Sequence, residues 1–280
     1  MRLFFAPTVF VIVLSCRASA VDPDLKELAV QIEKGTKNSK LKALEEAGAQ
    51  GAKAKLLLRP IATAMLNRDK DVKIAATDAM KKIDDHVEAI AVKLLIQFEQ
   101  VELVELMKEG KEVIDPLVPL LLNNYERLLD SRPQNGATLT KMQLILDCLY
   151  VNVPDDPGAN AAILKALKSP HIQLQHTGVI ASRLIKDGKK GLQDVMRIAK
   201  VCPNEGIRVL AVSTIPYLLD ENRRIQAGLA ALFGQAATTP IWSDEVNRKL
   251  ALKSLKELRL DTTEAVRDAA GRAIELIEKP

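Results

Sequence analysis

Residues capable of chemistry are sparse in this sequence, and their spacing does not assemble a reactive set. The three histidines are His86, His171 and His176. His171 and His176 are five positions apart, which turns them about 140° from each other on a helix, so they do not share a metal ion. The sequence has no His-Glu-x-x-His, Cys-x-x-Cys, phosphate-loop or nucleophile-elbow motif. We therefore predict no catalytic, cofactor-binding or metal-binding residues, and no enzymatic activity.

Two further patterns resemble ligand sites and are better explained as structure. The first is a run of carboxylates at helical spacing, formed by Glu99, Glu102, Glu105, Glu109 and Glu112. Carboxylates on one helix face do not wrap a calcium ion without a loop, so we interpret them as a solvated face. The second is the segment from Gly188 to Gly191, which lacks the following Ser or Thr of a phosphate-binding loop. We interpret it as a turn that ends a helix.

The elements that position these residues are helices arranged in pairs. The segment from Gly51 to Asp84 contains two helical runs separated by a polar turn at residues 67–70. In its second run apolar residues share one helical stripe: Val72, Ala75, Ala76, Ala79, Met80 and Ile83. One pair buries few side chains, at roughly 1.5 to 3 kcal/mol each, against about 1.5 kcal/mol of ordering cost per residue. The pair therefore needs neighbouring copies of itself to fold.

Copies of the stripe recur along the chain. They begin at Met142, Leu174, Ile207, Asn247 and Val266. Most steps are roughly 30 to 40 residues, the period of helix-pair solenoids. The distance from Val72 to Met142 in the sequence corresponds to two repeats, and the distance from Asn247 to Val266 corresponds to about half a repeat. Small residues in the stripe let neighbouring pairs approach closely, and larger aliphatic residues fill the space between them.

The start of the second helix carries a family resemblance. An acidic residue, a gap and then Val-Arg is typical of HEAT repeats, and the segments at Val72, Ile207 and Val266 are similar to it. The chain resembles the HEAT-repeat family over roughly residues 40–278, most weakly between 85 and 137. The resemblance implies an all-α fold, a right-handed α-solenoid of stacked antiparallel helix pairs. We expect it over residues 21–280, with an N-terminal cap at about 22–50 and a C-terminal cap helix at about 262–278.

We call the first residue of each stripe its anchor. The residue directly after each anchor is predicted to point outward. These residues are Lys73, Gln143, Gln175, Arg208, Arg248 and Arg267. Stacking in register would align these side chains in a row along the solenoid. Two interpretations stay open: a ladder of ion pairs with turn acids such as Asp69, Asp244 and Asp261, or a partner-binding surface.

The N-terminus has the pattern of a secretory signal peptide at residues 1–20. A basic start is followed by an apolar run and an Ala-x-Ala end, which predicts cleavage between Ala20 and Val21. The alternative is a lipoprotein signal with lipid attached at Cys16. We expect a secreted or periplasmic protein, or one anchored by lipid to the envelope, with no membrane-spanning segment. Cys148 and Cys202 would then remain, and because stacking separates them we predict two free thiols.

Charge and composition narrow the class of partner. The formal net charge of +4 falls to +2 when a signal peptide containing Arg2 and Arg17 is removed, and aromatic residues are 3%. Nucleic-acid binding calls for basic stripes interleaved with aromatic residues, so we exclude it. We predict an exported scaffold without a cofactor that binds a protein on its concave surface, lined by the second helices. The alternatives are a cofactor-handling protein similar to HEAT-like bilin lyases, or a self-associating structural element of the envelope.

Overall fold

The computed structural model describes residues 23–96, 99–131, 135–220 and 244–278, and these residues are helical with no β-strand among them. The all-α prediction is therefore confirmed for this part of the chain. The 3-10 helices are η1 (Gly51–Leu57) and η2 (Gly188–Gly191). The α-helices are α1 (Pro23–Lys34), α2 (Lys37–Gln50), α3 (Leu58–Met65), α4 (Lys70–Ile83), α5 (Asp85–Ile96), α6 (Gln100–Leu106), α7 (Lys111–Asp130), α8 (Gly136–Asn152), α9 (Pro157–Leu167), α10 (Ile172–Ser182), α11 (Leu192–Val201), α12 (Glu205–Leu219), α14 (Glu245–Leu258) and α15 (Glu264–Glu278).

Polar residues at the helix starts explain where many of these helices begin. The side chain of Asp69 accepts hydrogen bonds from the backbone N–H groups of Asp71 and Val72 at the start of α4. Such bonds satisfy donors that have no partner inside the helix. The same role is played by Thr36 for α2, Asn135 for α8, Asp156 for α9, Asn204 for α12 and Asp244 for α14.

The predicted apolar stripe forms the core. Its anchors Val72, Met142, Leu174, Ile207 and Val266 are all buried. The positions that follow them on the same stripe are also buried or half-buried, apart from Leu250 on α14, which is 39% exposed. The helical phase read from the sequence is therefore confirmed, and α14 is its weakest match.

The helices pack in two rows, with each helix touching its neighbours in the row. The first row consists of α1, α3, α7, α9, α11 and α14, and the second of α2, α4, α5, α6, α8, α10, α12 and α15. Contacts between the rows join consecutive helices into pairs, such as α3 with α4 and α11 with α12. The half step before Val266 is explained by this order, because Asn247 and Val266 lie on the two helices of one pair.

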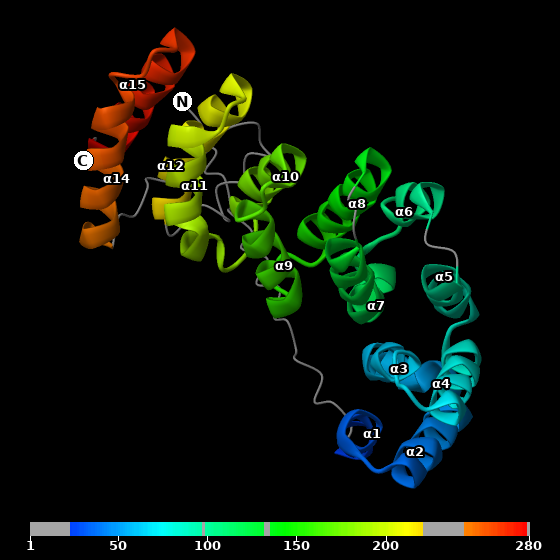
Figure 1. Ribbon diagram of the computed structural model, residues 1–280. Helices are drawn as coiled ribbons and strands as arrows, with labels where there is room; N and C mark the ends of the chain where they lie inside the picture. Colours follow the sequence, from blue (N-terminus) through cyan, green and yellow to red (C-terminus); the bar gives the residue numbers. More distant parts are fainter. Residues whose placement is uncertain (1–22, 97–98, 132–134, 221–243, 279–280) are drawn as a thin grey trace, which may run out of the picture.

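The order of the rows is irregular at one place. In the first row α3 contacts α7 directly, whereas in the second row both α5 and α6 lie between α4 and α8. Figure 1 shows the helices following one another along an arc, with α1, α3, α7 and α9 on its inner side. The expectation that second helices line the concave side is not met in this view. These two extra helices make the second row longer, which places that row on the outside of the bend.

The buried side chains form two clusters that meet at α9 and α10. The first extends from Leu25 to Ile185, and the second from Leu167 to Ile277. Gly178 of α10 permits the close approach there, because a Cβ at this position would lie 3.0 Å from the backbone nitrogen of Leu167. Leu164 of α9 packs against both clusters, so the two clusters adjoin each other at this contact.

Candidate functional site

In the structure the six residues predicted to form one outward row have different partners and do not form a single row. Arg208 donates to Asp261 Oδ1 at 3.2 Å and to the hydroxyl of Thr263. Arg267 donates to the backbone oxygens of Asp261 and Thr262 at 2.8 and 3.0 Å. These arginines hold the turn before α15 and are part of the scaffold.

Two more members of the row also bond to nearby backbone. The Gln175 amide donates to the Ser169 carbonyl at 2.7 Å, and Arg248 donates to the Ile277 carbonyl at 2.8 Å. Arg248 lies on α14, in the first row of helices, so it does not align with the other members. Gln143 is half-buried on α8. Only Lys73 is left at the edge of a groove.

One rung of the predicted ladder of ion pairs is present, and the other two acids pair with lysines outside the predicted row. Arg208 does pair with Asp261, as predicted. Asp69, however, pairs with Lys37 of α2 at 2.8 Å, and Asp244 pairs with Lys189 of η2 at 3.1 Å. Both acids cap the start of a helix, where a lysine from an earlier helix reaches them.

The groove that contains Lys73 lies between α4, α5 and α7, and we name it the basic groove. It has a volume of about 570 Å³. Its apolar lining comes from Met65, Leu66, Ile74, Val92, Leu95 and Ile96. Its polar lining consists of Lys73, Thr77, Asp78, Asn123 and Arg127. A smaller hollow of about 320 Å³ shares Leu95, Ile96 and Arg127 with it and reaches Leu128 and Ser131.

The exposure of its apolar residues distinguishes the basic groove from the core. Ile74 is 51% exposed and Ile96 is 75% exposed, although both are large aliphatic side chains. The C-terminal end of α5 is held in place by Asn124 of α7, whose amide donates to the Leu94 carbonyl at 2.9 Å. Ile96 is therefore presented from an anchored helix end.

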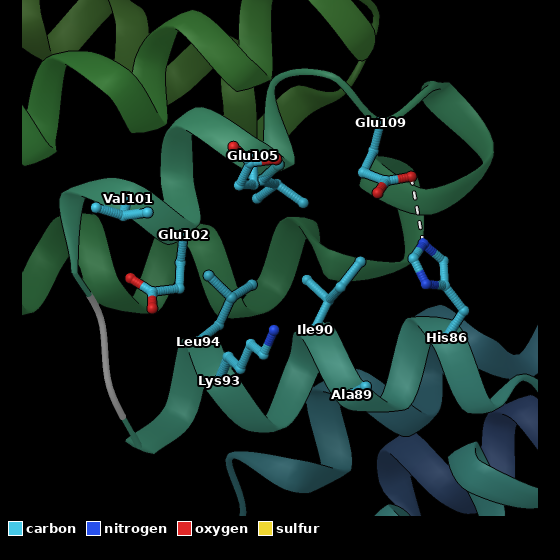
Figure 2. A pocket seen from close by; sticks show the side chains of 10 residues that line it. His86, Ala89, Ile90, Lys93, Leu94, Val101, Glu102, Glu105 and Glu109 are labelled. Atoms are coloured by element: carbon cyan, nitrogen blue, oxygen red, sulfur yellow. Dashed lines mark ion pairs between the residues drawn. The ribbon is translucent and has the colours of Figure 1, made fainter.

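The opposite flank of α5 forms a second groove with α6, which we name the acidic groove. Its volume is about 340 Å³, and in Figure 2 Glu102, Glu105 and Glu109 lie on the side opposite α5, with Glu109 directed towards His86. His86 Nε2 lies 3.3 Å from Glu109 Oε2, the ion pair drawn in Figure 2. Glu105 pairs instead with Lys108 at 2.7 Å. The oxygen Oε2 of Glu102 is buried without a hydrogen-bond partner in the described part of the chain.

The predicted solvated face of glutamates is thus only partly right. Glu102, Glu105 and Glu109 gather at one groove, whereas Glu99 pairs with Lys141 of α8 at 2.8 Å. The sequence spacing places these residues on a helix, but α6 ends at Leu106, and Glu109 follows in the turn. No group of three or more His, Cys, Asp or Glu residues in the described ranges is placed to hold a metal ion.

Buried titratable groups do not form a reactive site. Burial raises the pKa of Asp147 on α8 to about 6, although a hydrogen bond with Tyr150 acts in the opposite direction. Burial also raises the pKa of the Cys148 thiol to about 12, which makes it a poor nucleophile. Cys148 and Cys202 are both buried and free, as the sequence predicts.

Sequence reasoning missed the residues that complete the basic groove, namely Ile96 and Arg127. Neither residue belongs to a motif or stripe identified in the sequence, and an apolar residue in a sequence does not show whether a neighbouring helix covers it. The available signal was the irregular step between Val72 and Met142, which marked the place where the stacking changes. The predicted signal peptide, its cleavage site at Ala20 and Val21, and Cys16 lie outside the described residues.

Comparison with known proteins adds no relative. No protein-family model matches the chain, and no curated protein matches it either. The HEAT-repeat resemblance therefore stays a prediction. None of the helices in the described ranges is long and apolar enough to cross a membrane.

Proposed function

We propose that this protein is an exported, non-enzymatic scaffold of HEAT-like helix pairs that binds another protein through the grooves beside α5. The two rows of helices and the buried stripe support an α-solenoid arrangement. The observation that carries the proposal is the exposure of Ile74 and Ile96 in a groove of about 570 Å³. Exposed apolar surface beside charged side chains is typical of interaction sites.

The test is site-specific photo-crosslinking on the full mature chain. A photoreactive amino acid replaces Ile96 in the basic groove, Val101 in the acidic groove, or Val201 on α11 as a control of similar exposure. The chains are mixed with the exported proteins of the source cell. We expect one protein to be crosslinked at Ile96 or Val101 and not at Val201. Equal labelling at all three positions, or none at the grooves, would refute binding at α5.

Export is tested by a separate measurement. Mass spectrometry of the native N-terminus distinguishes three outcomes: a start at Val21, an acylated Cys16, or retention of Met1. We expect a start at Val21, because the Ala-x-Ala pattern ends at Ala20. Retention of Met1 would contradict export while leaving the binding proposal unaffected.

A further inference from the structure

We propose that the basic groove binds an amphipathic acidic segment of a partner protein. An aliphatic side chain of that segment inserts between Ile74 and Ile96, and a carboxylate is held by Arg127 and Lys73. This inference rests on the proposed scaffold function and specifies the chemistry of its partner.

The apolar half of the inference follows from the arrangement of the two isoleucines. Ile74 extends from α4 and Ile96 from the end of α5, and both line the same groove. Val92 and Leu95 lie half-buried on the same α5 flank. An aliphatic side chain placed here removes apolar surface from water on both sides at once, and hydrophobic burial is proportional to that area. The groove is within the size range of sites that bury small ligands, so it accepts a few side chains of a helix.

The polar half follows from the charges at its edge. Lys73 and Arg127 line the groove with a single acid, Asp78. Neither cation has an ion-pair partner among the residues that the structure describes. By contrast, Lys37, Arg59 and Arg208 are each paired with a carboxylate. A planar guanidinium matches a carboxylate with two parallel hydrogen bonds, so Arg127 is suited to bind one.

The two flanks of α5 discriminate between partners of opposite charge. The acidic groove carries Glu102, Glu105 and Glu109 together with Lys93 and His86, so its carboxylates outnumber its cationic groups and disfavour a carboxylate-bearing segment (Figure 2). The basic groove, on the other side of the same helix, carries Lys73 and Arg127, which have no ion-pair partner among the described residues. Complementary and opposing charges so close together select the partner and fix its position. An acidic segment is therefore directed to the basic groove.

The experiment measures peptide binding to the full mature chain by fluorescence anisotropy. The probe is a labelled helical peptide with leucines on one face and glutamates on the other, and its counterpart carries lysines in place of the glutamates. We expect the acidic peptide to bind and the lysine counterpart to bind at least about tenfold more weakly. Higher salt is expected to weaken binding of the acidic peptide, because salt screens the attraction between exposed charges.

Substitutions in the groove test its two halves separately. Arg127→Glu and Ile96→Gln are each expected to lower the affinity for the acidic peptide by about tenfold or more. Their matched controls on α15 are Arg272→Glu and Leu276→Gln, which alter exposed residues far from the groove and should leave binding unchanged. Circular dichroism verifies that each variant is folded. The double variant Lys73→Glu with Arg127→Glu should reverse the preference towards the lysine peptide.

The outcomes distinguish this inference from the scaffold function. If the wild-type chain prefers the lysine peptide, or if Arg127→Glu and Ile96→Gln behave as their α15 controls do, the inference is overturned. Crosslinking of a partner at Val101 alone would overturn it as well, while leaving the scaffold function in place. Absence of crosslinks at both grooves would instead remove the scaffold function itself.

Discussion

At the scale of single residues, Arg59 connects helices that are far apart in the sequence. It extends from α3 and pairs with Asp115 of α7 at 3.2 Å and with Asp156 at the start of α9. The Asp156 side chain is only 4% exposed and also accepts a hydrogen bond from the Ala159 N–H at 2.8 Å. One cation therefore ties three helices of the first row together.

We expect Arg59→Met to destabilise the protein by about 1 to 3 kcal/mol. The substitution leaves the buried carboxylate of Asp156 without its cation, while the partial exposure of Arg59 keeps the loss below that of a fully buried pair. Urea unfolding measures the change in free energy. Lys42→Met is the control, since the Lys42–Glu46 pair is long at 3.7 Å and largely exposed. A loss at Arg59 no greater than at Lys42 would contradict the role given to this junction.

A second residue-scale expectation concerns Asp147 and pH. Its folded-state pKa is raised to about 6 from the ordinary 3.8, mainly by burial. Between these two values the unfolded chain has released a proton that the folded chain still holds, so stability falls as pH rises through this window. Asp147→Asn should therefore raise the melting temperature at about pH 7 and have little effect at about pH 3.

The matched control for Asp147 is Asp268→Asn, an exposed carboxylate on α15. It should show no comparable gain at neutral pH. A gain for Asp147→Asn that was equal at both pH values would show that burial of the charged form is not its cause.

At the scale of elements, the seam between neighbouring helices is the feature on which the fold depends. Ala270 of α15 is fully buried, and α15 packs on both α12 and α14. We expect Ala270→Arg to cost at least about 3 kcal/mol, because it inserts a charge into a close helix contact without a partner. Ala265→Arg is the same change at an exposed position of the same helix and should have little effect. Thermal melts followed by circular dichroism compare the two variants.

The helices and their buried faces were predictable from the sequence, and the grooves were not. Stripes such as that of Val72, Ala76 and Met80 report which side of a helix is apolar, and the structure buries them. They do not report how many helices occupy each row, so they could not predict that α5 lies beside α4 and α6. Ile96 illustrates the limit, because an apolar residue is part of the core when a neighbouring helix covers it and lines an exposed groove when none does.

At the scale of the whole molecule, the contacts run mostly between neighbouring pairs. In such arrays stability is close to a sum of local terms, so damage at one end need not spread to the other. The substitution Leu255→Asp, in the second buried cluster, should lower hydrogen-exchange protection in α14 and α15, and next in α12. Protection in α2 and α4 should stay close to that of the wild type. Uniform loss along the chain would indicate a single cooperative unit instead.

The doubled step at α5 and α6 has a consequence for how such a chain acquires a new surface. Because every other pair contacts mainly its immediate neighbours, two additional helices in one row change the direction of the arc while the remaining interfaces keep their order. The same insertion leaves both sides of α5 incompletely covered, which creates two hollows of opposite charge. A local departure from periodicity thus forms the two grooves to which we assign binding, while the parts on either side keep the regular stacking.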